Sequence, residues 1–413
     1  MKHLCVVCLV LISLNFASAE GPPEVTRGEC LNGLAGELFP CGAVALLNKL
    51  DLRNSGIKAK RASDIWGWTD SQTGKEYAIV GMNNKTAFVD ISDPVAPIHL
   101  GDLKTQTVSS VWRDIKVYKD HAYIVSEARG HGMQVFDLTR LRTPQDKPIE
   151  FTVDTHYKGF GSAHNIVINE DSGFAYAVGS NTCDRGMHVV DIRNPIRPRF
   201  STCIDRSIFE PVNDRNNKHG EGYTHDAQCV NYKGPDIKFL GKEICFCANA
   251  DTVNIVDVTD KSAPYQISVK TYNGVGYTHQ GWLTEDHRYF LLGDETDEMN
   301  GAHPTKTLIW DMQSLESPSY LSSHWHSTMA IDHNMYVRGN YVYQANYDAG
   351  LRVLDLSKIG EGKLQEVAFF DSEPSSNVAA FKGAWSIFPY YKSDVVVLSN
   401  TSGHLFILRP NLP

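Results

Sequence analysis

Beyond its first twenty residues, the sequence lacks any long apolar run. No later stretch approaches the ~20 consecutive apolar residues that a membrane-spanning helix needs, and the last residues, Arg409–Pro413, carry no anchor or retention signal. Basic residues are also few, since 39 Lys and Arg against 48 Asp and Glu give a net charge of -9. We therefore expect no nucleic acid and no anionic membrane as partners, because both require a basic surface.

Two further absences narrow the fold and the chemistry. Apolar residues nowhere keep a 3.6-residue period for more than a few turns, so helices are not expected to dominate. No nucleophile-elbow or serine-triad pattern is present, which excludes the common hydrolases. Small molecules and glycans stay open as ligands, and the oligomeric state is not determined by the sequence.

Residues 1–19 have the layout of a secretory signal peptide. Lys2 supplies a positive start, Leu4–Phe16 form an apolar run, and Ala17–Ala19 provide a small-residue cleavage site. We therefore expect a secreted, extracellular protein whose mature chain begins near Glu20.

The cysteines agree with an oxidising compartment. The chain has nine of them, and seven follow the signal peptide. We expect three disulfides and one leftover thiol: Cys30 with Cys41, Cys183 with Cys203, and Cys229 with either Cys245 or Cys247. The same compartment makes Asn84 and Asn400 usable as glycosylation acceptors.

A β-strand that ends in aspartate occurs six times along the chain. A seventh, similar strand near the end of the chain lacks the aspartate. Six aspartates mark the repeat: Asp90, Asp137, Asp191, Asp257, Asp311 and Asp355. They are expected to bind turn amides between the third and fourth strands of each unit. The repeat length is close to the ~40 to 50 residues of propeller blades. We therefore predict an all-β fold, a seven-bladed β-propeller of four-stranded blades over residues 61–413.

Residues 20–60 precede the first repeat. We expect them to form a short N-terminal extension that packs on the propeller as a cap and includes a short helix within Leu34–Leu52. The strand that holds Phe406–Leu408 is expected to close the ring against the region of the first blade.

Four histidines recur at one phase of the repeat, and tryptophans are assigned to that phase in the other units. The predicted ring around the channel mouth is Trp66, Trp112, His164, His225, His279, His333 and Trp385. Clustered neutral imidazoles suit a divalent metal such as iron, copper, manganese or zinc. We predict that the four histidines bind one metal ion and that the tryptophans plug or shape the channel. Duplication of a repeat that carries a functionless histidine is the alternative.

Other polar residues are candidates for supporting roles. Glu127, Glu295 and Asp226 are candidates to orient ligands or move a proton, and Gln280 is available as a further ligand beside the channel. The acidic run Asp294–Glu298 has two interpretations. It lacks the full spacing of a calcium loop, so a solvated acidic loop is favoured and calcium is kept as a possible cofactor.

Several longer runs resemble the choice-of-anchor B family, whose blades carry LVIVD-type repeats. The similar segments are 64–68, 112–117, 164–171, 222–229, 276–283 and 332–334, within a match of roughly residues 60 to 410. The resemblance implies a secreted propeller and no particular reaction. It also implies that Cys183, Cys203, Cys229 and Cys245 are the paired cysteines, which leaves Cys247 as the odd thiol.

Two classes of function remain at this point. One is a metal-dependent oxidoreductase or lyase, by analogy of architecture with propellers that hold a catalytic metal through channel histidines. The other is a non-catalytic extracellular matrix protein or glycan- or protein-binding propeller.

Overall fold

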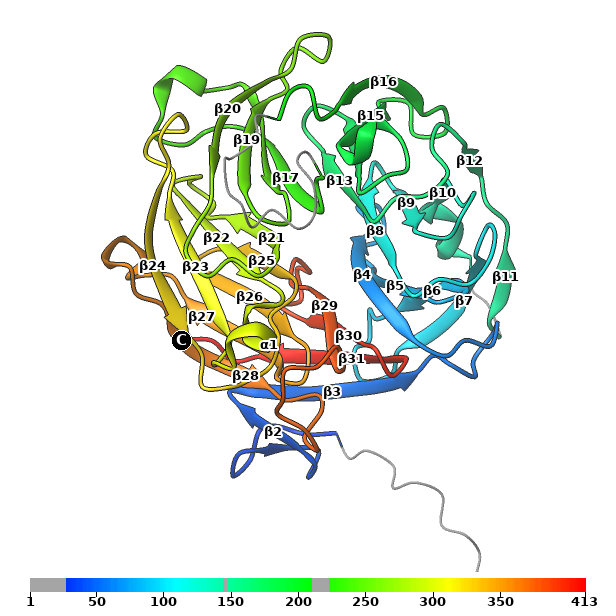
Figure 1. Ribbon diagram of the computed structural model, residues 1–413. Helices are drawn as coiled ribbons and strands as arrows, with labels where there is room; N and C mark the ends of the chain where they lie inside the picture. Colours follow the sequence, from blue (N-terminus) through cyan, green and yellow to red (C-terminus); the bar gives the residue numbers. More distant parts are fainter. Residues whose placement is uncertain (1–26, 144–146, 210–222) are drawn as a thin grey trace, which may run out of the picture.

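The computed structural model describes residues 27–143, 147–209 and 223–413. Their strands form seven sheets arranged in a ring (Figure 1). The predicted all-β, seven-bladed propeller is therefore confirmed. The proposed signal peptide lies outside the described residues. No helix within the described ranges is long and apolar enough to cross a membrane.

Each blade is a meander of four antiparallel strands, and the first strand of each blade faces the ring centre. Blade 1 comprises β4 (Ala62–Thr69), β5 (Glu76–Met82), β6 (Lys85–Asp90) and β7 (Ile98–Lys104). Blade 2 comprises β8 (Arg113–Tyr118), β9 (His121–Ser126), β10 (Met133–Asp137) and β12 (Thr155–Tyr157). Blade 3 comprises β13 (Asn165–Asn169), β14 (Phe174–Val178), β15 (Met187–Asp191) and β16 (Arg199–Ile204). The short β11 (Ile149–Phe151) adds to β7 in parallel.

The remaining blades repeat this order. Blade 4 comprises β17 (Asp226–Asn231), β18 (Glu243–Ala248), β19 (Val253–Asp257) and β20 (Tyr265–Lys270), and blade 5 comprises β21 (Thr278–Leu283), β22 (Tyr289–Asp294), β23 (Lys306–Asp311) and β24 (Ser319–Trp325). Blade 6 comprises β25 (Met335–Arg338), β26 (Tyr341–Asn346), β27 (Gly350–Asp355) and β28 (Gln365–Phe370). Blade 7 comprises β29 (Ala384–Phe388), β30 (Val396–Asn400), β31 (His404–Pro410) and β3 (Val44–Asp51). Among the residues that the structure describes, helix is confined to α1 (Asp297–Gly301) and four short 3-10 turns.

The six repeat aspartates have the predicted structural role. Each side chain accepts a hydrogen bond from the backbone amide two residues further on, at 2.5 to 3.0 Å. These bonds fix the turn between the third and fourth strands of six blades. Apolar residues from neighbouring sheets then form seven buried clusters, one between each pair of adjacent blades.

The N-terminal segment differs from our expectation. Residues 34–52 contain no helix; they form β1 (Leu34–Ala35), β2 (Phe39–Gly42) and β3. Strand β3 pairs antiparallel with β31 and supplies the outer strand of blade 7, so the two ends of the chain close the ring. Strand β2 extends blade 6 by pairing with β28. The segment is thus part of the sheets, because its apolar residues find partners about 360 positions away that a local pattern does not reveal.

The disulfides are Cys30–Cys41, Cys183–Cys203 and Cys229–Cys245, as expected. Cys229 lies directly opposite Cys245 in the β17–β18 pair, which explains why Cys247 stays free. The two glycosylation acceptors differ. Asn84 is half-buried and donates a hydrogen bond to the Lys58 carbonyl, so its glycosylation stays a prediction. Asn400 is only 1% exposed in the folded chain, and its glycosylation also stays a prediction.

Candidate functional site

Side chains near the start of the innermost strands tie neighbouring blades together. Asp64 accepts a hydrogen bond from the amide of Ile115, Asp114 from that of Ile166, and Gln280 from that of Met335. Each acceptor has an equivalent residue in the next blade, and the donor amide belongs to the residue directly after that equivalent. This relation gives the alignment of the seven innermost strands. We call the aligned set the girdle: Asp64, Asp114, Asn165, Asp226, Gln280, Asn334 and Ser386.

This alignment corrects the predicted ring. The residues directly before the girdle are Ser63, Arg113, His164, His225, His279, His333 and Trp385. Trp66 and Trp112 are therefore out of register with the histidines. Trp66 lies three residues after Ser63, and Trp112 lies one residue before Arg113. Trp112 precedes its strand and is 47% exposed, whereas Trp66 faces a different part of the channel.

The four histidines lie side by side at the mouth where the innermost strands begin, which we call the upper mouth. Ring centroids of successive histidines are 4.3, 4.4 and 4.4 Å apart from His164 through His225 and His279 to His333. Trp385 continues the row at 4.9 Å from His333. The predicted arc over four consecutive blades is therefore present.

Backbone carbonyls orient two of these rings. The Nδ1 of His225 is 2.8 Å from the His279 carbonyl oxygen, and the Nδ1 of His333 is 2.5 Å from the Trp385 carbonyl oxygen. Since a carbonyl only accepts, Nδ1 carries the proton and Nε2 keeps its lone pair. Burial lowers the pKa of His225 and His279 well below the ordinary value, and lowers that of His333 to about 3. These imidazoles are neutral at neutral pH.

Glu295 faces the Nε2 atoms of two histidines. Its carboxylate oxygens are 3.8 Å from Nε2 of His279 and 3.6 Å from Nε2 of His333. One ligand atom from each of these three residues lies within 4.8 Å of the other two, and this is the one such group of three in the described part of the chain. The Tyr347 hydroxyl donates to Glu295 at 3.2 Å. Burial raises the pKa of Glu295 to about 7.

The loop that carries Glu295 is not the solvated acidic loop we expected. Asp294, Asp297 and Glu298 are all buried. Asp294 accepts from the amides of Gly276 and Tyr277 at 2.8 and 2.6 Å, and Asp297 pairs with Lys306. These donors offset the cost of burying Asp294 and Asp297. The prediction of a solvated loop is wrong because the donors come from elsewhere in blade 5, and the calcium alternative stays a prediction.

The other end of the row has a second glutamate at the equivalent position after the second strand. The Nδ1 of His164 is 2.6 Å from Oε1 of Glu127. Burial opposes the charge, but this carboxylate raises the pKa of His164 overall. His164 and His225 lie outside the group of three. One ion held by all four histidines therefore stays a prediction, and the tighter geometry is that of His279, Glu295 and His333.

The remaining candidates have other surroundings. Gln280 is buried, and its side-chain amide donates to the Met335 carbonyl and accepts from the Met335 amide. Asp226 faces the lower part of the channel, where burial raises its pKa to about 7. The sequence had identified Glu295 only as a group that orients ligands or moves a proton. A ligand role for it was missed because its distance to the histidines depends on a loop outside the repeat.

Comparison with known proteins matches two parts of this architecture. Residues 74–105, which span β5 to β7, and residues 333–360, which begin at His333, match the family model of the LVIVD repeat. No curated protein matches the chain. The name choice-of-anchor B stays a prediction. The matches and the fold together make the chain a seven-bladed propeller with LVIVD repeats.

Proposed function

We propose that the upper mouth binds a divalent transition metal ion through His279, His333 and Glu295, and that the chain is a metal-dependent oxidoreductase or lyase. The observation that carries this proposal is the approach of the Glu295 carboxylate, whose side chain is only 14% exposed, to two imidazole Nε2 atoms 3.6 to 3.8 Å away. A carboxylate buried without a formal cation is costly, and a metal ion removes that cost. Two histidines and one carboxylate form a donor set known from non-haem iron and zinc enzymes.

The surroundings support a metal centre beyond its three ligands. The carbonyl of Trp385 holds the His333 ring, and Tyr347 holds Glu295, which are the outer contacts that metal ligands usually have. His225 is next in the row and is available as a fourth ligand. Its own Nδ1 is already bound to a carbonyl, which turns Nε2 away from the protein backbone.

A catalytic role is favoured over a purely structural one because three protein ligands leave coordination positions open. When bound, such an ion supplies Lewis-acid or redox chemistry to a substrate beside it. At the other end of the row, the His164–Glu127 pair holds a proton on the same mouth. This pair is placed to give or take a proton as a general acid–base group.

Secretion is part of the same proposal. Three disulfides support it, since such bonds persist in oxidising compartments. The layout of residues 1–19 provides the corresponding export signal.

Metal content is the direct test. Protein produced without a metal-affinity tag would be analysed by mass spectrometry for iron, manganese, copper and zinc, and titrated calorimetrically after chelation. We expect about one ion per chain in the wild type and less than about a tenth of that in the double variant His279→Ala with His333→Ala. The matched control, His121→Ala with His404→Ala, removes two half-buried histidines outside the site. Equal metal content in all three proteins would contradict the site.

Open coordination is tested separately from binding. The protein would be loaded with Co(II), whose visible absorption depends on its ligands, and titrated with azide. A saturable spectral change is expected if positions are open to substrate. A spectrum unaffected by azide would leave a structural metal and overturn the catalytic part of the proposal.

A further inference from the structure

The channel contains a second cavity at its other end, with a volume of about 600 Å³. The innermost strands begin at the histidines and run past the girdle, so this cavity lies toward the mouth where they end, which we call the lower mouth. The residue two positions after the girdle faces the cavity in every blade, as expected from the two-residue period of a strand. These residues are Trp66, Lys116, Val167, Gln228, Trp282, Tyr336 and Phe388.

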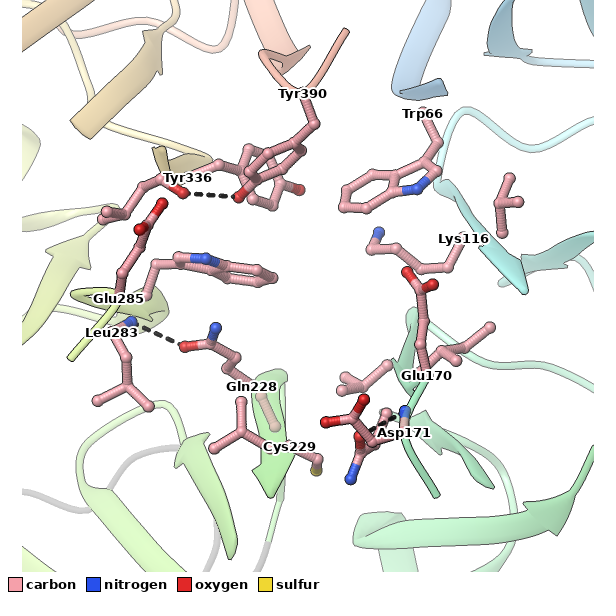
Figure 2. A pocket seen from close by; sticks show the side chains of 18 of the residues that line it. Trp66, Lys116, Glu170, Asp171, Gln228, Cys229, Leu283, Glu285, Tyr336 and Tyr390 are labelled. Atoms are coloured by element: carbon pink, nitrogen blue, oxygen red, sulfur yellow. Dashed lines mark hydrogen bonds between the residues drawn. The ribbon is translucent and has the colours of Figure 1, made fainter. Parts of the chain in front are cut away.

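One side of the cavity is aromatic. Trp282, Tyr336, Phe388 and Trp66 come from four consecutive blades, 5, 6, 7 and 1. Ring centroids are 4.9 Å apart for Trp282 and Tyr336, 5.4 Å for Tyr336 and Trp66, and 5.1 Å for Trp66 and Phe388, all at steep interplanar angles. Tyr390 extends this wall, and Figure 2 shows it beside Trp66 and Tyr336. Both tryptophans are only half-buried, so ring surface remains for a ligand.

The facing side, from blades 2 to 4, is polar. Figure 2 shows Gln228 beside Leu283, with Glu170 and Asp171 on the other side of the cavity. Glu170 and Asp171 are exposed at the rim, as is Glu285 below Trp282. The Oε1 of Gln228 accepts from the Leu283 amide at 2.7 Å, which fixes the side chain and leaves its NH2 group to donate to a ligand. This wall offers both acceptors, such as the carboxylates of Glu170 and Asp171, and donors, such as Lys233 and the NH2 group of Gln228. A ligand that both donates and accepts several hydrogen bonds therefore fits best.

The charges select the class of ligand further. The Lys116 ammonium lies 4.6 Å from the Trp66 ring centroid and is bound to Asp114 at 2.7 Å. It already occupies the aromatic face that an organic cation would need. Anions are disfavoured by the rim carboxylates. What remains is a neutral molecule with one apolar face and many hydroxyl donors.

We propose that the lower cavity binds a neutral saccharide, with a pyranose ring stacked on Trp282 and its hydroxyls donating to Glu170 and Asp171 and accepting from the NH2 group of Gln228. The volume is within the range of small-molecule sites and accommodates a short oligosaccharide. This site is separate from the metal centre, since the girdle lies between them and no histidine of the row lines the cavity.

Binding would be measured on the chelator-treated full chain by saturation-transfer NMR and tryptophan fluorescence. The probes are cellobiose and N,N′-diacetylchitobiose as neutral saccharides, choline as a cation and glucuronate as an anion. We expect saturable binding of at least one disaccharide in the millimolar range or tighter. Loss of a stacking ring in Trp282→Ala should weaken it roughly tenfold. Glu170→Gln, at an exposed position, should weaken it without affecting folding.

The matched control is Trp325→Ala, which removes a tryptophan that is 54% exposed on an outer strand. Its saccharide affinity should equal that of the wild type. Binding of neither disaccharide, tighter binding of choline or glucuronate, or an affinity unchanged in both Trp282→Ala and Glu170→Gln would each overturn the proposal.

Discussion

Leu46→Ala tests the closure of the ring by the two ends of the chain. Leu46 lies on β3, opposite Leu408 of β31, and is 1% exposed. It belongs to the cluster between blades 6 and 7, with Phe39, Val44 and Phe406 among its members. Because these neighbours sit on different strands that are paired in sheets, they have little freedom to fill the space that a shorter side chain leaves.

The expected cost follows from this burial. Leucine to alanine removes three carbon groups, and at ~0.8 kcal/mol each the lost transfer free energy is about 2.4 kcal/mol. The cavity that remains raises the total to about 3 to 4 kcal/mol. Leu38→Ala is the matched control, since this leucine belongs to the same N-terminal segment but is 51% exposed. It should cost less than ~0.5 kcal/mol.

Urea unfolding followed by tryptophan fluorescence and by circular dichroism would give the free energy of unfolding of each variant. The midpoint should fall for Leu46→Ala, with the slope unchanged. A loss below ~1 kcal/mol, or one equal to that of Leu38→Ala, would refute the pairing of β3 with blade 7.

Two further predictions concern titration and reactivity. Arg142 donates two hydrogen bonds of 2.7 Å to Asp70, and they lower the pKa of this carboxyl in the folded chain. Asp70 therefore contributes stability above its unfolded pKa of about 4, and this stability is lost as the pH falls further. The free energy of unfolding of Asp70→Asn should therefore be below that of the wild type at pH 7, with the gap narrowing at pH 3. Burial raises the pKa of Cys247, so its thiol should react with Ellman's reagent only after denaturation, and that signal should be absent in Cys247→Ser. Reaction of the native thiol at the rate of a free cysteine would contradict its burial.

The repeat made the fold predictable, since each blade carries its own evidence. The six aspartates mark one turn per blade, and the alternation of apolar residues before them specifies the strands. Local spacing suggested two of the disulfides but left Cys245 and Cys247 open as the partner of Cys229. The family resemblance selected Cys245, which lies opposite Cys229 in one hairpin. Contacts within one repeat are local, and local spacing is what a sequence shows.

Features that depend on distant partners were less accessible. A short helix was expected within Leu34–Leu52, where the chain instead forms strands, because β31, the partner of β3, lies at the other end of the chain. Trp66 and Trp112 were aligned with the histidines by residue type and approximate spacing, although they lie three residues after and one residue before the equivalent positions, Ser63 and Arg113. Glu298 was expected in solvent, although the folded loop buries it. Each error arose where tertiary structure decides the position of a side chain.

Repeat duplication without function is the main alternative for the histidine row, and the structure argues against it. A duplicated relic would repeat its surroundings as well as the residue, yet the row differs from end to end. His164 binds Glu127 through Nδ1, whereas His333 turns Nδ1 to a carbonyl and Nε2 toward Glu295. The aromatic wall of the lower cavity is likewise limited to four consecutive blades. Both mouths thus break the sevenfold repeat over part of the ring, as binding of an asymmetric ligand requires. The turn aspartates, which serve the fold alone, recur in six blades.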